Sequence, residues 1–109
     1  MIEVTTSEFD ARISGSDSGP YLVDFWSPIC GRCYALRPQL EGGLGDEDHA
    51  MAINVFDEPE LAERYDVKSL PVVLLIDSGK VVGRYDDPIL STQVIEDFRK
   101  LQTKLRLAR

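Results

Sequence analysis

The feature that most constrains the fold is a short apolar run from Tyr21 to Trp26, interrupted by one carboxylate, Asp24. The run has the length of a strand, and apolar residues stand on both of its faces. Such a strand is typical of a parallel sheet covered on both sides, because each apolar face must be kept from water. We therefore expect this segment to lie in the interior of the protein.

Patterns on either side of this run predict the remaining elements. In the first half of the chain we expect a helix opened by a capping box at Thr5–Glu8 and carrying Phe9 and Ile13, a loop over Gly15–Pro20, the strand Tyr21–Trp26, and a helix after Cys30 that is kinked at Pro38 and fades by Gly42-Gly43. In the second half we expect a strand over Ala50–Phe56, a helix capped by Asp57 and reaching Tyr65, and strands over Val72–Ile76 and Lys80–Tyr85 joined at Asp77-Ser78-Gly79. A last helix should begin near Ser91, with an apolar stripe made of Val94, Ile95, Phe98, Leu101 and Leu105. This order predicts an α/β protein with a central mixed β-sheet flanked by helices on both faces.

Length and charge bound the class of protein. The 109 residues fit one domain spanning 1–109. The net charge of −7 argues against a nucleic-acid partner, because phosphate backbones are bound by clustered Lys and Arg.

The start, Met1–Thr5, has no basic or apolar part of a secretory signal. The longest apolar run, Val72–Ile76, is far shorter than the ~20 residues that span a membrane. We expect a cytoplasmic monomer without a membrane partner, although a processed mature form would look the same.

The two cysteines of the chain, Cys30 and Cys33, directly follow the buried strand where a helix is expected to begin. Their spacing brings both sulfurs to one side of the first helical turn, close enough to bond. At a helix N-terminus the Cys30 thiolate is stabilised and can attack a substrate disulfide. Cys33 can then resolve the mixed disulfide by attacking Cys30. The pattern predicts thiol–disulfide exchange.

Three other interpretations of the cysteine pair stay open. A zinc site would need four ligands, and only His49 and carboxylates remain to complete the set. A purely structural disulfide would close too small a loop to constrain the unfolded chain much. Two unrelated buried thiols would not explain why the pair follows a strand and opens a helix.

Asp24 and Trp26 extend the candidate site. Burial of a carboxyl group raises its pKa, so that Asp24 can hold a proton near neutral pH and exchange it with a nearby thiol. The alternative is that Asp24 faces water at a strand edge. Trp26 stands four residues before Cys30, a place that suits a lid beside the dithiol, although it could also be an ordinary core residue.

At these residues the chain resembles the thioredoxin family over almost its whole length. The matching segments are Val23-Asp24-Phe25-Trp26-Ser27, Cys30-Gly31-Arg32-Cys33, Pro38, Leu70-Pro71 and the hairpin around Gly79. The resemblance implies the thioredoxin fold, with Cys30 exposed as the nucleophile, Cys33 more buried as the resolving thiol and Asp24 beneath it as the proton carrier. It also implies a cis bond between Leu70 and Pro71, with the Leu70 backbone pairing with an extended substrate segment.

Several residues depart from the family's pattern around the cysteines. Arg32 replaces the usual proline. A cation beside the cysteine pair should favour the Cys30 thiolate, and so give the pair a more oxidising reduction potential than the family's typical reductase. We expect Arg32 and Gly31, the two residues between the cysteines, to tune this potential. Ile29 stands where an aromatic residue is common, and we expect it to contact substrate. Ala52 replaces a lysine usually found near the buried aspartate, which should make Asp24 still harder to ionise.

Two further departures concern the choice of partners. The stretch after Pro38 is shortened, with Gly42-Gly43 where helix would normally continue. Asp87-Pro88 stands where the family usually carries a glycine that lines the substrate groove, which adds charge and removes a backbone donor.

The leading prediction for function is a reductase of protein disulfides that is recharged by an upstream thioredoxin reductase or a small thiol. An isomerase or oxidase is the alternative that Arg32 favours, and a binding module with an incidental dithiol is a third. The chain has neither a G-x-G-x-x-G nor a G-K-[ST] motif, so we expect no cofactor and no metal.

Overall fold

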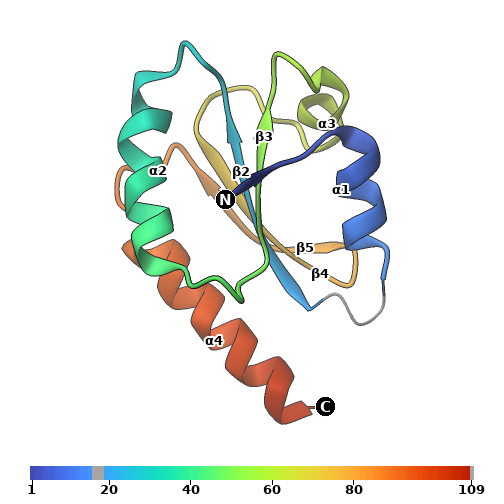
Figure 1. Ribbon diagram of the computed structural model, residues 1–109. Coiled ribbons are helices and arrows are strands. Elements are labelled where there is room, and N and C mark those ends of the chain that lie inside the picture. Colours follow the sequence, from blue (N-terminus) through green and yellow to red (C-terminus); the bar gives the residue numbers. More distant parts are fainter. Residues whose placement is uncertain (16–18, 109) are drawn as a thin grey trace.

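The computed structural model describes residues 1–15 and 19–108, so that residues 16–18 of the expected loop lie outside the described residues. Its centre is a five-stranded sheet of order β1-β3-β2-β4-β5, with α2 and α4 to one side and α1 and α3 to the other in Figure 1. The strands are β1 (Ile2–Glu3), β2 (Pro20–Trp26), β3 (Ala50–Asn54), β4 (Val72–Asp77) and β5 (Lys80–Asp86). The helices are α1 (Thr6–Ile13), α2 (Gly31–Gly43), α3 (Pro59–Arg64) and α4 (Thr92–Ala108).

The sheet is mixed, as predicted. β2 is its middle strand and pairs in parallel with β3 and antiparallel with β4. In this register Asp24 lies between Ala52 of β3 and Val73 of β4. β1 was not predicted, because a two-residue strand is too short to show any alternation of apolar and polar residues; it pairs in parallel with β3.

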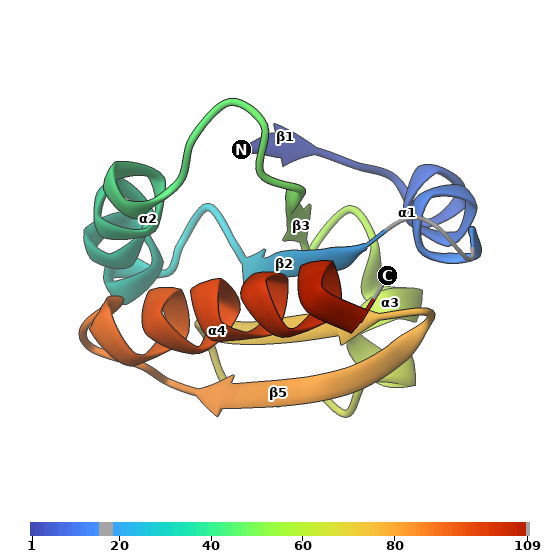
Figure 2. The same ribbon diagram turned by 90° about the horizontal axis from the view of Figure 1, so that it is seen from below.

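Each face of the sheet packs against two helices. Helices α1 and α3 cover one face, and the buried residues of that core are Val4, Phe9, Ile13, Tyr21, Val23, Phe25, Met51, Ile53, Leu61, Val72, Leu74 and Ile76. Helices α2 and α4 cover the other, with Leu22, Leu36, Leu40, Val73, Leu75, Val94 and Phe98 buried there. Seen from below, α2 and α1 stand at opposite sides of the sheet (Figure 2). Alternate residues of β2 therefore face different helices, and Asp24 shares the α2 side with Leu22.

Two local predictions are confirmed. The Thr5 side chain accepts from the Glu8 N–H at 3.2 Å while the Glu8 carboxylate accepts from the Thr5 N–H at 2.9 Å, the two bonds of a capping box. Ser78 and Gly79 both have positive φ, 53° and 78°, as the tight turn between β4 and β5 requires. Helix α2 runs through Pro38, and a kink there stays a prediction.

The predicted end of the strand over Ala50–Phe56 and the predicted start of the helix after it were wrong. The strand ends at Asn54 rather than Phe56, because the Asn54 side chain accepts from the Phe56 N–H at 3.0 Å and its carbonyl accepts from the Asp57 and Glu58 N–H groups. These bonds turn the chain. Asp57 is not the N-cap of α3; Glu58 holds that position, and its side chain accepts no capping hydrogen bond from the helix. Its carboxylate instead accepts from the Thr6 backbone N–H at 2.7 Å.

The glycine at position 43, the last residue of α2, is favoured by packing. A Cβ at Gly43 would lie 2.9 Å from the Ile95 side chain of α4, whereas a Cβ at Gly42 would meet nothing within 4 Å. We expect Gly43→Ala to lower the free energy of unfolding by about 1–3 kcal/mol through overpacking. Gly42→Ala is the matched control and should be neutral or stabilising by less than about 1 kcal/mol. Denaturant unfolding of both variants checks this, and equal effects would refute it.

In the described part of the chain, none of the helices has both the length and the apolar character needed to cross a membrane.

Candidate active site

The two cysteines lie where β2 gives way to α2 and are joined by a disulfide, with their Cα atoms 5.3 Å apart. Cys30 is the N-cap residue of α2, and its sulfur accepts a hydrogen bond from the Cys33 N–H at 3.1 Å. Backbone N–H groups at a helix N-terminus are otherwise unpaired and carry a partial positive charge. The same N–H is therefore placed to stabilise a thiolate on Cys30 once the disulfide is reduced.

The two sulfurs differ in access to solvent. Cys30 is partly exposed, whereas Cys33 is buried and only 2% exposed. Gly31 and Arg32, between them, are exposed, and so is Ile29 before them, at 80%. A large substrate can reach Cys30 but not Cys33, which is the arrangement that the predicted roles require.

Asp24 lies inside the protein. Its side chain is on the middle strand and 1% exposed, so the alternative that it faces water at a strand edge is wrong. Burial raises its pKa from 3.8 to about 6, against the opposing charge and hydrogen bond of Arg37. A carboxyl group that titrates there is suited to take up and release a proton near neutral pH.

Arg37 is a site residue that the sequence reasoning missed. Its Nε donates to Asp24 Oδ2 at 3.1 Å, and its guanidinium carbon lies 5.1 Å from the centre of the Trp26 ring. Ala52 does lie opposite Asp24, but the inference that Asp24 therefore lacks a cation was wrong, because α2 supplies one from the neighbouring layer. The available signal was spacing, since Arg37 stands one helical turn after Cys33 and so shares its face of α2.

Trp26 lies beside the buried cysteine, in the place predicted for a lid. Its ring packs edge-on against Tyr34 of α2, with the ring centres 6.0 Å apart. A cavity of about 190 Å³ is lined by Glu3, Trp26, Cys33, Tyr34 and Arg37. The cavity joins the buried Cys33 to Arg37, the cation that is paired with Asp24.

The loop before β4 carries the Leu70-Pro71 pair. The peptide bond between Leu70 and Pro71 is cis, as the resemblance implied. Pro71 is buried, and its carbonyl accepts from the Asp87 N–H at 2.8 Å. Pairing of the Leu70 backbone with substrate stays a prediction.

The charge of Arg32 is shared with another residue. Its guanidinium forms an ion pair with Asp87, which follows β5. The sequence predicted a cation beside the cysteine pair without a partner being considered, and the ion pair adds that Asp87 partly neutralises this cation. The oxidising effect expected of Arg32 is therefore smaller than the sequence alone indicated.

This pairing can be tested through Asp87. We expect Asp87→Asn to free Arg32, favour the Cys30 thiolate and make the reduction potential of the pair more oxidising. We expect Arg32→Pro to make that potential more reducing. Both shifts should stay within about 20 mV, since exposed ion pairs contribute about 1 kcal/mol or less. Equilibration of each variant with a glutathione buffer gives the potentials. No change in either variant would refute an electrostatic role for Arg32.

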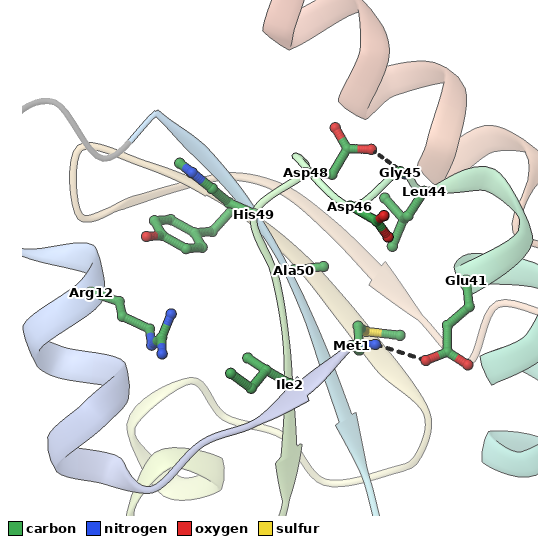
Figure 3. A pocket seen from close by; sticks show the side chains of 11 residues that line it. Met1, Ile2, Arg12, Glu41, Leu44, Gly45, Asp46, Asp48, His49 and Ala50 are labelled. Carbon is green, nitrogen blue, oxygen red and sulfur yellow. Dashed lines mark hydrogen bonds and ion pairs between the residues drawn. The ribbon is translucent and has the colours of Figure 1, made fainter.

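His49 does not join the cysteines. It precedes β3 at the end of the sheet where β2 begins, while the cysteines follow the other end of β2. Its ring stacks on Tyr21, with the centres 4.7 Å apart, and both line a pocket of about 560 Å³ next to Met1 and Glu41 (Figure 3). Within residues 1–15 and 19–108 no group of three or more His, Cys, Asp and Glu side chains is arranged to hold a metal ion. The ligand set that the zinc interpretation needed is not assembled there.

Comparison with known proteins agrees with this geometry. A family model described as thioredoxin matches residues 1–100. Thioredoxin 2 of Chlorobaculum tepidum is 41% identical over 85 residues, which are 75% of this chain and 77% of that protein. Thioredoxin of Staphylococcus epidermidis is 36% identical over 87 residues, which are 77% of this chain and 81% of that protein.

The fold has a solved counterpart as well. The X-ray structure of Fasciola hepatica thioredoxin matches 93% of this chain and 99% of its own, with a TM-score of 0.81 and 24% identity. A disulfide that opens a helix after the middle strand, and relatives that cover most of the chain, lead to one conclusion. The chain belongs to the thioredoxin family of thiol–disulfide oxidoreductases.

Proposed function

We propose that this protein reduces disulfides in other proteins with Cys30 as the nucleophile, Cys33 as the resolving thiol and Asp24 as the proton carrier. The observation that carries the assignment is the difference between the two sulfurs. Cys30 is partly exposed and accepts the N–H bond at the start of α2. Cys33 is 2% exposed and lies on α2, the helix that packs on the sheet face to which Asp24 belongs.

The cycle has two exchange steps. The Cys30 thiolate attacks one sulfur of the substrate disulfide, forms a mixed disulfide and releases the first substrate thiolate. Cys33 then gives its proton to Asp24 and attacks the Cys30 sulfur, which releases the second substrate thiolate. Two electrons pass from the dithiol to the substrate, and the protein is left with the Cys30–Cys33 disulfide that the structure shows.

Substrate contacts are proposed for the residues around Cys30. Ile29 is 80% exposed and offers an apolar surface, and Trp26 lines a cavity together with Cys33. Pro71 is proposed to contribute to the same substrate surface. Leu70 precedes the cis bond, and its backbone is proposed to pair with an extended substrate segment in the manner of an added strand. Arg32 and Gly31 are proposed to tune the reactivity of Cys30.

The remaining proposals concern the setting of this chemistry. A thioredoxin reductase or a small thiol would return the disulfide to the dithiol. A cytoplasmic location is proposed because thiols are kept reduced there, which a reductase requires. A single domain over 1–109 is supported by the two cores, to which elements from α1 to α4 contribute. A monomeric state is proposed as well.

The direct test is reduction of a protein with interchain disulfides, such as insulin, with dithiothreitol as the electron donor. The wild type should accelerate reduction well beyond dithiothreitol alone, and a variant with both cysteines replaced by serine should not. Acceleration by the double variant would refute the dithiol mechanism. An inactive wild type that nevertheless binds a partner, with or without the cysteines, would favour the binding-module alternative.

A further inference from the structure

Asp24 is held on one oxygen only. Its Oδ2 accepts from Arg37 Nε at 3.1 Å, whereas Oδ1 is buried and has no hydrogen-bond partner in the parts of the chain that the structure describes. A buried carboxyl oxygen without a partner is costly. It is also the atom at which a proton can be added without breaking the bond to Arg37.

Arg37 is itself fixed from several sides. Its side chain is 23% exposed, its guanidinium lies over the Trp26 ring at 5.1 Å, and its Nη2 is 3.7 Å from Glu3 Oε1. An arginine bound in this way loses much of its freedom to rotate and presents its N–H groups in a set direction. The contact with Asp24 therefore belongs to a built cluster that spans β1, β2 and α2.

The two strands beside Asp24 offer no cation that could take the place of Arg37. Ala52 of β3 and Val73 of β4 are the residues opposite Asp24, and neither side chain carries a charge. Arg37 is the residue that forms an ion pair with Asp24, and it stands one helical turn after Cys33. The same face of α2 thus carries both the thiol that must lose a proton and the cation that holds the proton acceptor.

We propose that Arg37 is the positioning residue of the proton transfer: it holds Asp24 through Oδ2 and leaves Oδ1 for the proton of Cys33. This inference rests on the proposed function. In the step, the Cys33 S–H bond breaks, the proton binds Asp24 Oδ1, and the Cys33 thiolate forms the S–S bond to Cys30 while the substrate thiolate leaves. The proton later returns from Asp24 to solvent, and the cavity of about 190 Å³ that Cys33 and Arg37 line is large enough for water molecules.

The charges around Asp24 act with opposite signs. Burial raises the pKa of the Asp24 carboxyl most, and the nearby Glu3 and Glu41 raise it further, whereas the charge and hydrogen bond of Arg37 lower it. Glu3 comes from β1, while Arg37 and Glu41 come from α2. Removing Arg37 and removing the charge of Glu3 should therefore move Asp24 in opposite directions, a result that a merely structural role would not produce.

The experiment measures the pKa of Asp24 by NMR of the carboxyl carbon in the oxidised protein, and the pH profile of disulfide reduction, in four variants. Arg37→Met should raise the Asp24 pKa by about one unit or more, as expected for the loss of an opposite charge in contact. The acid limb of the rate profile should move by the same amount, so that the rate on that limb falls about tenfold per unit. Arg37→Lys should retain most of the wild-type behaviour.

The other two variants are controls. Glu3→Gln should lower the Asp24 pKa and move the acid limb the opposite way. Arg64→Met removes an arginine of α3 that pairs with Asp10 on the far face, and it should leave the Asp24 pKa unchanged. Near-UV circular dichroism verifies that each variant is folded. If Arg37→Met is not folded, Arg37→Gln, which also removes the charge, takes its place and is expected to give the same shifts.

Two results would overturn the proposal. An Asp24 pKa that Arg37→Met and Glu3→Gln leave unchanged would show that Arg37 does not act on Asp24. A shifted pKa without a shifted acid limb would show that Arg37 holds Asp24 but has no part in the reaction. Failure of the proposed function is distinguishable, because then the wild type itself would not reduce disulfides, while the Asp24 pKa would still report on Arg37.

Discussion

Cys33→Ser protein is expected to stall with its substrate attached to Cys30 as a mixed disulfide. Cys30 is partly exposed and can still attack, but no thiol remains in the protein to release the substrate. Catalysed reduction of the substrate should therefore fall to the background rate of the added reductant. A non-reducing gel or intact-mass measurement should show the adduct, and dithiothreitol should cleave its disulfide bond.

The matched variant is Cys30→Ser. It keeps Cys33, which is 2% exposed, so it should form little adduct and have no catalysed turnover. An adduct that accumulates in Cys30→Ser rather than in Cys33→Ser would reverse the assigned roles. Equal adducts in both variants would mean that the geometry at the start of α2 does not select the nucleophile.

Asp24→Asn is expected to abolish a large pH dependence of stability. The folded-state pKa of Asp24 is raised from 3.8 to about 6. Below pH 3.8 the group is protonated in both states, and between 3.8 and about 6 only the unfolded chain loses the proton, so the free energy of unfolding falls as the pH rises. The shift corresponds to about 3 kcal/mol, and the loss is complete above pH 6.

The measurement is the difference in the free energy of unfolding between wild type and Asp24→Asn, obtained from denaturant titrations at pH 3.5 and pH 7.5. Other carboxyl groups titrate in both proteins and cancel, among them Asp48 and Asp97, whose pKa values are lowered first by hydrogen bonds from Arg99 and Tyr85. Relative to wild type, the variant should gain about 3 kcal/mol over this range. A difference that does not change with pH would mean that Asp24 is not perturbed as its burial requires.

Asp24→Asn should also slow the resolving step near neutral pH, because an amide cannot take the Cys33 proton. Mixed disulfide should accumulate in this variant more than in wild type, although less than in Cys33→Ser. Rapid acid quenching followed by mass measurement separates the two steps.

Much of the site could be predicted because its parts lie close together in the sequence. The apolar run with one carboxylate indicated a buried Asp24, and the spacing of Cys30 and Cys33 after it indicated a disulfide at the start of a helix. These are local patterns, and the period of the strand and the turn of the helix decide where such side chains point. The structure places all three where these patterns indicated.

The contacts that were missed join residues that are far apart in the chain or lie in different layers. Arg37 reaches Asp24 across the packing of α2 on β2, and Arg32 meets Asp87 from a loop 55 residues away. Helical spacing indicates that Arg37 shares a face with Cys33, but it does not identify the partner of either arginine, because that depends on how two elements pack. Their effect on the site is electrostatic, so an estimate of charge from the neighbours in sequence alone was incomplete at Asp24 and at Cys30.

The equilibrium reduction potential of the Cys30–Cys33 pair tests the central claim most directly. Equilibration of the protein with glutathione or dithiothreitol buffers, followed by thiol trapping, gives its value. The account predicts a potential at or below the cytosolic glutathione poise of about −220 to −260 mV, as a disulfide reductase requires. A clearly more oxidising value, near the roughly −180 mV of a disulfide isomerase, would contradict it in favour of an isomerase or oxidase, and failure to form the disulfide would contradict any redox role.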